Sequence, residues 1–308
     1  MEQVRAYHLA VFPRSRDAAE DGGNPTTIFL NADGLSSSDM QSLAGQNSHE
    51  CGFVLSGGPE ANSPCRYTMR YWVPNHEMEM CGHATVGAVW LMNFLGILPA
   101  TDGVLISTKS GPVEARLARQ EDGSVAVLVS QPTGSVDDLA RERVLDTVAC
   151  LGLTEDDLAP GYRVQNACTS RTKTLIPVKS RDVLSGIQPS ADSVRAVCEK
   201  IGSTGLYPYV ILDSGKQLVE ARQFPRSSGY LEDPATGIAA AALTFGLLDS
   251  SIVSPGTTDP IRVRQGWAMG KPSEIQVQLR LEDGKVAGCW ISGNVKLREK
   301  GLEGGRQS

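Results

Sequence analysis

Two segments of similar sequence, about half the chain apart, constrain the fold more than any other feature. One runs from Glu79 to Met92 and the other from Glu232 to Leu248; both contain an acidic residue, a Gly- or Pro-containing turn, an Ala-Thr pair and an apolar run. The two Ala-Thr pairs lie 151 residues apart in a chain of 308. A helix that is apolar on all sides must be buried, and a repeated segment predicts repeated structural units. We therefore expect two similar halves, each a sheet around one central buried helix.

The composition agrees with a strand-rich α+β protein. Hydrophobic residues make up 41% of the chain and charged residues 21%, as in soluble globular domains. The 32 glycines and 17 prolines provide many turns, so the strands are expected to be short and numerous. Between the strands, the apolar spacing predicts helices over Ser36–Asn47, Val136–Leu151 and Ala191–Ile201.

The boundary between the halves is expected near the middle of the chain, where the turn-forming residues Gln131–Ser135 are the best linker candidate. A return of the last strand to the N-terminal half is left open. The expected parts are an N-terminal half over 1–131 with its central helix at about 84–95, a C-terminal half over 132–300 with its central helix at about 236–248, and a disordered tail over 301–308.

Charge and cysteine usage restrict the partners and the compartment. A net charge of −6 without clustered Lys and Arg argues against a nucleic-acid partner. No apolar run approaches the roughly 20 residues that span a bilayer, and the first residues do not resemble a signal peptide, so no membrane association is expected. The seven cysteines are scattered without a C-x-x-C pair, which favours a reducing, cytoplasmic setting.

The start of each apolar helix is a candidate binding site. The unpaired N–H groups of a first helical turn and the helix dipole attract anions, and small residues such as Gly82 and Gly237 let a ligand come close to the backbone. His83 and Asp233 lie at the two helix starts, placed to hydrogen-bond a small carboxylate held between the halves. The alternative is that Thr85 and Asp233 are ordinary helix caps and that His83 is a turn residue.

Glu50 is a candidate acid/base group. It lies in the segment Asn47–Leu55, where a predicted helix ends and an apolar strand begins. A carboxyl group in apolar surroundings binds its proton more tightly, as a general acid/base must. The alternative is a solvated glutamate in a loop.

Neither a metal nor an organic cofactor is expected. Glu77, Glu79, Cys81 and His83 alternate along the chain, but ligands at every second position of one straight strand diverge. No Walker, Rossmann or G-x-S-x-G motif is present in its required context.

Several of these residues also belong to short motifs that occur in order along nearly the whole chain. Together the motifs resemble the phenazine-biosynthesis PhzF-like family. The resemblance implies the diaminopimelate-epimerase fold: two pseudo-symmetric halves, each a mostly antiparallel, barrel-like sheet around a central helix, with the active site between them. The matching motifs are Gly23-Asn24-Pro25, Asn47-x-x-Glu50, Cys81-Gly82-His83-Ala84-Thr85-x-Gly87, Glu232-Asp233-Pro234-Ala235-Thr236-Gly237, Gln265-Gly266 and Gly270-Lys271-Pro272-Ser273.

The resemblance also implies a function: a cofactor-independent isomerase of secondary metabolism that moves a proton on a small amino or hydroxy carboxylic acid. The family's best-understood substrate is trans-2,3-dihydro-3-hydroxyanthranilate, and a homodimer is what the family suggests. The motif glutamate that moves the proton falls on Glu50, and the residues that hold the substrate's polar groups fall on His83 and Asp233. The substrate-binding residues are then Gly82, Ala84, Thr85, Thr236, Gly237 and Ile238.

Two departures from the family pattern predict a different pocket. Ile238 stands where many members have Ser, and Ala10 stands where an Asp is usual. Both changes remove polar groups and argue against the phenazine precursor itself as the substrate.

Two other functions are kept as alternatives. Related racemases of this fold use one cysteine at each central helix, and Cys81 matches the first, whereas Pro234-Ala235 offers no thiol for the second. An amino-acid racemase or epimerase would then pair Cys81 with Glu50. A non-catalytic protein that binds small carboxylates is the other alternative.

Overall fold

A buried helix stands at the centre of each half of the chain. In the computed structural model, which describes residues 3–17, 20–58, 60, 63–98, 102–120, 122–215, 217–256 and 259–300, these helices are α2 (Gly82–Phe94) and α6 (Gly237–Asp249). Helix α2 is buried from Gly82 to Val89 and α6 from Gly237 to Leu247. The predicted pair of central buried helices is therefore confirmed.

The chain divides into two units. Unit 1 holds the described residues up to Ser130 and those from Ser292 onward, and unit 2 holds Gln131–Ile291. The strand β18 (Val295–Lys300) pairs antiparallel with β1 (Arg5–Val11), so the end of the described chain belongs to the sheet in which the chain starts. The expected tail over 301–308 lies outside the described residues.

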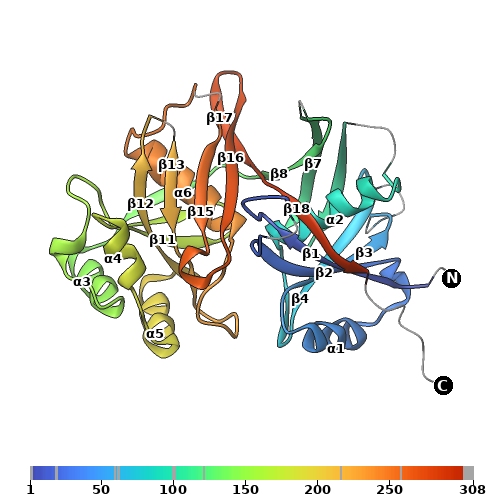
Figure 1. Cartoon of the computed structure of the whole chain (residues 1–308), viewed down its shortest axis with the longest axis horizontal. Coiled ribbons are helices and arrows are strands. Elements are labelled where there is room, and N and C mark those ends of the chain that lie inside the picture. The colour runs from blue at the N-terminus through green and yellow to red at the C-terminus, as the bar shows by residue number, and fades with distance from the viewer. Residues whose placement is uncertain are drawn as a thin grey trace. The chain divides into compact units, whose positions relative to one another are not determined.

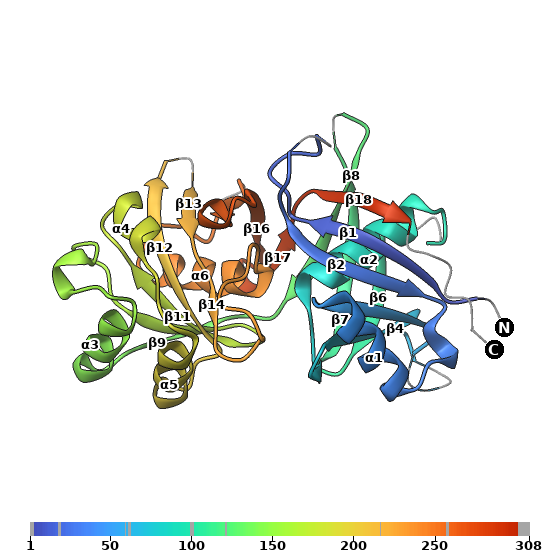
Figure 2. The same ribbon diagram turned by 60° about the horizontal axis from the view of Figure 1, so that its bottom comes forward.

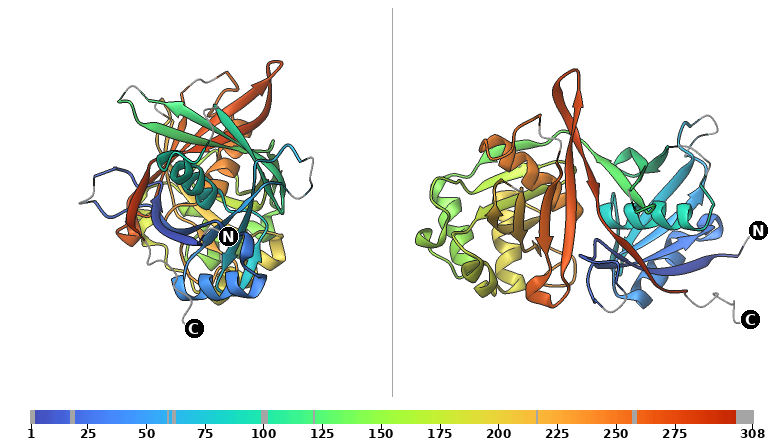
Figure 3. Two further views of the ribbon diagram at one scale, coloured as in Figure 1. Left: turned by 90° about the vertical axis from the view of Figure 1, so that its right-hand side faces the viewer. Right: turned by 45° about the horizontal axis from the view of Figure 1, so that its top comes forward.

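Unit 1 is a sheet that curves around α2. The left view of Figure 3 shows α2, in teal, nearly end-on with strands of the unit around it. The strands pair in the order β18–β1–β2–β3–β4–β6–β7–β8, with β5 added to β4. The further elements of the unit are β2 (Asn24–Leu30), α1 (Ser37–Asn47), β3 (Cys51–Ser56), β4 (Tyr67–Val73), β5 (His76–Met78), β6 (Gly103–Thr108), β7 (Gly111–Arg119) and β8 (Val125–Gln131), which ends at the unit boundary.

Unit 2 repeats this plan around α6 (Figure 1). Its strands pair in the order β9–β10–β11–β12–β13–β15–β16, with β14 added to β12. Its further elements are β9 (Ser135–Asp138), α3 (Arg141–Cys150), β10 (Gln165–Cys168), β11 (Thr172–Pro177), α4 (Arg181–Gly186), α5 (Ala191–Ile201), β12 (Gly205–Asp213), β13 (Leu218–Ala221), β14 (Phe224–Pro225), β15 (Ile261–Gln265), β16 (Ser273–Glu282) and β17 (Lys285–Ser292).

The two units share one topology. From β1 to β7 successive neighbours pair antiparallel, parallel, antiparallel, parallel and antiparallel, and the strands from β10 to β16 follow the same series. In both units the central helix lies in the second parallel crossover, between β4 and β6 or between β13 and β15. The α+β fold of two pseudo-symmetric, mostly antiparallel halves is therefore confirmed.

Glycine and apolar side chains fix the distance between each central helix and its sheet. A Cβ added to Gly246 of α6 would lie 2.3 Å from Leu175 Cδ1 of β11, so a larger residue there would force the Leu175 side chain to move. On the other face of the unit 2 sheet, Ile176, Leu206 and Phe224 form a second core with residues of α5. Figure 2 labels α5 and several strands of this unit. Alternate residues of β11 therefore face α6 and the outer helices in turn.

The predicted helix over Val136–Leu151 is wrong in its first residues. Residues Ser135–Asp138 form β9, in which Val136 pairs with Ala167, and α3 begins only at Arg141. Ladder pairing with β10 outweighs the local helical pattern there because it satisfies the backbone groups of both strands. The short helix α4, capped by Ser180, was not anticipated.

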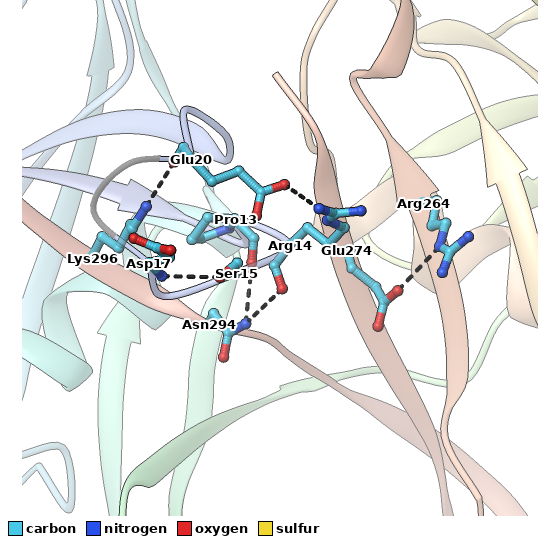
Figure 4. A network of polar contacts seen from close by, with 9 residues as sticks. All are labelled: Pro13, Arg14, Ser15, Asp17, Glu20, Arg264, Glu274, Asn294 and Lys296. Carbon is cyan, nitrogen blue, oxygen red and sulfur yellow. Dashed lines mark hydrogen bonds and ion pairs between the residues drawn. The ribbon is translucent and has the colours of Figure 1, made fainter. Parts of the chain in front are cut away.

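Side-chain hydrogen bonds fasten the loop after β1 to the strand that ends the described chain (Figure 4). Asn294 Nδ2 donates to the carbonyl oxygens of Pro13 and Arg14, both at 3.2 Å, and Lys296 Nζ donates to that of Glu20 at 2.7 Å. The same figure shows the ion pair between Arg264 of β15 and Glu274 of β16, which joins neighbouring strands of unit 2.

No helix in the described part of the chain is long and apolar enough to span a membrane.

Candidate active site

Glu50 lies directly before β3 and is buried, with 7% of its surface exposed. Helix α1 ends at Ser48, which takes the left-handed conformation and donates its N–H to Ala44. The chain then turns into β3, and Thr26 Oγ1 of β2 donates to the Glu50 backbone oxygen at 2.9 Å. The expected position between a helix and an apolar strand is thus observed, and the solvated-loop alternative is wrong because Glu50 is buried.

His83 lies in the first turn of α2, within the electrostatic reach of Glu50. Burial lowers the pKa of His83, whereas the negative charge of Glu50 and the Pro25 carbonyl act to raise it. The Cys81 Sγ atom lies 3.4 Å from His83 Nδ1. Unit 1 therefore gathers a carboxyl, an imidazole and a thiol at the start of its central helix.

The backbone at the start of α2 has no side-chain cap. The N-cap residue is Cys81, whose side chain makes no capping hydrogen bond. Thr85 lies one turn into the helix, where its Oγ1 donates to the Cys81 carbonyl at 2.8 Å and contacts the Tyr71 hydroxyl at 2.6 Å. Thr85 is thus not the cap that one alternative assigned to it. The first-turn N–H groups of Gly82, His83 and Ala84 point toward the helix start, where an anion would bind.

Unit 2 places Asp233 and Thr236 at the start of α6, held by Gln265. Gln265 is fully buried; its Nε2 donates to the Asp233 carbonyl at 2.6 Å, and its Oε1 accepts from Thr236 N at 3.3 Å and from the Tyr207 hydroxyl at 2.9 Å. Thr236 Oγ1 donates to Asp233 Oδ2. These contacts explain why Gln265-Gly266 occurs among the sequence motifs: the glutamine holds the turn that carries Asp233.

The start of α6 parallels that of α2. Its N-cap is Thr236, again without a capping side-chain hydrogen bond, so Asp233 is not the cap either. Gly237 and Ile238 form the first turn and are both buried. Ile238 therefore presents an apolar side chain in the first turn of α6.

Two buried polar residues near Asp233 were missed by sequence reasoning. Lys173 of β11 is 6% exposed, and Gln223 is 1% exposed. The charge of Asp233 acts on Lys173, and the Gln223 backbone oxygen accepts the N–H of Asp233 at 3.0 Å. The sequence offered little signal, because the contact of Leu175 with α6, which shows the face that Lys173 shares, comes only from the tertiary structure.

Within the described residues, no group of three or more His, Cys, Asp or Glu side chains is placed to hold a metal ion. Glu77, one member of the alternating series, instead forms ion pairs with Arg70 at 2.6 Å and Lys109 at 2.5 Å.

The chain is similar to known proteins over nearly its whole length. The family model of the phenazine biosynthesis-like proteins (PhzC-PhzF) matches residues 18–298. The chain is 30% identical over 297 residues to the "Uncharacterized isomerase YddE" of Escherichia coli K12, covering 95% of this chain and 96% of that protein. It is 27% identical to the "Trans-2,3-dihydro-3-hydroxyanthranilate isomerase" of Pseudomonas aeruginosa PAO1, covering 88% and 90%.

The fold has close counterparts among solved structures. A PhzF-family phenazine biosynthesis protein of Bacillus anthracis superposes with a TM-score of 0.83 at 24% identity, covering 98% of this chain and 99% of that one. The family model covers most of the chain, and the relatives that it resembles along nearly its whole length are isomerases. The chain is therefore an isomerase of the phenazine biosynthesis-like (PhzC-PhzF) family.

Proposed function

We propose that the protein is a cofactor-independent isomerase that moves a proton on a small amino or hydroxy carboxylic acid, with Glu50 as the general acid/base. The observation that carries the proposal is the buried Glu50 carboxyl, whose charge acts on His83 at the uncapped start of α2. A buried acid/base group beside anion-binding N–H groups suits a substrate with an acidic C–H near a carboxylate.

In the proposed reaction, the Glu50 carboxylate takes a proton from one carbon of the substrate. The electron pair of that C–H bond shifts into the adjacent conjugated system, and the carboxylic acid of Glu50 returns the proton to another carbon. No atom is gained or lost, so no redox partner is required. His83 and the first-turn N–H groups of α2 stabilise the charge that develops. In unit 2, Asp233 and Thr236 are the groups suited to an amino or hydroxyl group of a ligand.

A deuterium experiment tests the proposal. Amino and hydroxy carboxylic acids, trans-2,3-dihydro-3-hydroxyanthranilate among them, are incubated with the enzyme in D2O and analysed by mass spectrometry. We expect the wild type to isomerise one compound with deuterium uptake and Glu50→Gln to reduce that rate about 100- to 10,000-fold. Glu50→Gln removes the acid/base group with little change in shape. Full activity of this variant would refute the assignment.

A matched control separates the loss of a carboxyl from the loss of the fold. Glu114 of β7, also in unit 1, pairs with Arg116 near the surface. The Glu114→Gln variant makes the same chemical change and is expected to keep wild-type turnover. If both variants lose activity equally, the loss is structural. If no compound takes up deuterium with the wild type but several bind, the non-catalytic alternative is favoured.

A racemase or epimerase that uses Cys81 is the second candidate, favoured by the 3.4 Å contact between the thiol and His83 Nδ1. Because burial lowers the pKa of His83, its neutral imidazole is available to accept the thiol proton. The Cys81→Ala variant separates the candidates. The isomerase mechanism predicts near-normal turnover, whereas a racemase would lose exchange at the α-carbon.

A further inference from the structure

The inner face of the unit 2 sheet carries a pair of buried polar side chains that the proposed mechanism leaves unused. Leu175 of β11 contacts α6, so Lys173, two residues earlier on the same strand, faces the same side. Gly205 and Tyr207 share that face of β12, and Tyr207 reaches Gln265 at the start of α6. Lys173 therefore lies on the face that carries the start of α6.

Gln223 has polar atoms that nothing in the described chain satisfies. The residue is 1% exposed, and both its amide nitrogen and its amide oxygen are without a hydrogen-bond partner. Buried amides almost always have partners, because an unpaired one loses its water without replacement.

Lys173 is the second buried polar side chain of this region. Within the described residues its ammonium group has no hydrogen bond or ion pair, although Asp233 acts on it electrostatically. A Cβ placed on Gly205 would lie 2.2 Å from Gln223 Nε2 and 3.3 Å from Lys173 Nζ. Both nitrogens therefore lie beside Gly205, and the Gln223 amide occupies the place that a side chain at position 205 would need.

We propose that Lys173 and Gln223 form a carboxylate-binding subsite beside Asp233. The ammonium and the amide N–H groups donate to the carboxylate oxygens, and the free Gln223 oxygen accepts from a neighbouring hydroxyl or amino group. Asp233 then binds the amino or hydroxyl end of the same molecule, and Lys173 offsets the repulsion between Asp233 and an anionic ligand. The inference rests on the proposed function only in taking this ligand to be the isomerase substrate.

The charge state of Lys173 gives the subsite a pH dependence. Burial lowers the pKa of Lys173 to about 8; Asp233 and Cys198 act to raise it, and Arg171 and Arg226 act to lower it. A carboxylate bound by the ammonium should therefore bind more weakly as the pH rises through about 8. An uncharged ligand should show no such change.

Protection from acetylation tests the subsite. The full-length protein is treated with isotope-labelled acetic anhydride, and acetylation of Lys173 is measured by peptide mass spectrometry. The probes are anthranilate and 2-aminobenzamide, which differ only in that the first has a carboxylate where the second has an amide. Acetate and acetamide form a second, smaller pair of the same kind. We expect the carboxylates to slow acetylation of Lys173 at least about fivefold, the amides to have no effect, and exposed Lys200 to react alike throughout. Equal protection by both members of each pair, or protection by neither, would overturn the proposal.

Substitutions provide an independent readout by calorimetry. Lys173→Met and Gln223→Leu are each expected to weaken anthranilate binding about tenfold or more, the loss of at least one hydrogen bond, and to leave 2-aminobenzamide binding unchanged. Lys200→Met, on α5 with an ion pair to Asp146 at 3.5 Å, is the matched control and should bind as the wild type. Circular dichroism checks that each variant is folded. If Lys173→Met is not folded, the binding result for Gln223→Leu alone tests the subsite. Wild-type affinity in Gln223→Leu would contradict the subsite.

Failure of the subsite can be distinguished from failure of the isomerase mechanism. Glu50 belongs to unit 1, so Glu50→Gln should retain carboxylate protection of Lys173 while losing deuterium exchange. Normal exchange in Glu50→Gln refutes the mechanism and leaves the subsite standing. Normal exchange with unprotected Lys173 in the wild type refutes the subsite alone.

Discussion

The buried ion pair between Arg222 and Glu232 is the strongest single link in the segment that leads to Asp233. Arg222 is 8% exposed, and its guanidinium donates to both carboxylate oxygens of Glu232 at 2.9 and 2.7 Å. It also donates to the carbonyl oxygens of Leu184, Ser185 and Ile187 around the end of α4, at 2.9, 3.2 and 2.7 Å. One side chain thus fixes both α4 and the residue before Asp233.

Arg222→Met keeps much of the side-chain volume but leaves the Glu232 carboxylate, 11% exposed, without its cation. Removing one partner of a buried pair costs about 3–5 kcal/mol, because the remaining charge stays out of water unpaired. That is a large part of the 5–15 kcal/mol by which natural domains are stable. In Arg222→Met/Glu232→Gln no buried charge remains, so the loss should be smaller than in Arg222→Met; what remains is the cost of the carbonyl oxygens that lose Arg222, about 1–3 kcal/mol.

The free energy of unfolding is measured by urea titration with circular dichroism for the wild type, both single variants and the double variant. Arg143→Met is the control: Arg143 forms an exposed pair with Asp146 on α3 and should lose less than about 0.5 kcal/mol. A loss in Arg222→Met no larger than in this control, or a double variant as unstable as the sum of the singles, would refute the reasoning.

Two further predictions concern the same unit. Gly266 has φ +82°, and an added Cβ would lie 2.2 Å from the Lys271 oxygen and 2.8 Å from the Pro234 oxygen; Gly266→Ala should therefore destabilise by about 2–4 kcal/mol. Gly270→Ala, at φ +66° in open space, should lose only about 1 kcal/mol by the same titration, and equal losses would contradict the packing argument. Because the pKa of Lys173 is about 8 in the folded protein against an ordinary 10.5, the unfolded chain binds more protons between these values. The unfolding free energy should hence rise by about 3 kcal/mol from pH 8 to 10.5 relative to Lys173→Met, and parallel pH profiles would disprove the shift.

The sequence predicted the candidate site to different degrees at different residues. Glu50, His83 and Asp233 were found because each belongs to a motif and lies at the end of an apolar segment, which is a local signal. Lys173 was not found, because the residues that surround a lysine in a strand come from neighbouring strands and from the helix packed on the sheet, and not from the adjacent sequence. The same limit applies to β9, where pairing with β10 overrides a helical pattern.

What the sequence alone determined is the repeat: two wholly apolar segments must form buried helices, and a sheet must cover each of them, because apolar surface is excluded from water. The tertiary structure decided which polar groups meet. Gln265 holds the Asp233 turn, Thr26 holds the Glu50 backbone, and the Gln223 amide and the Lys173 ammonium lie beside Gly205. These contacts join residues tens of positions apart through parallel crossovers and strand register. The local spacing of the sequence predicts neither the crossovers nor the register, because hydrogen-bond partners are fixed only when the strands have paired.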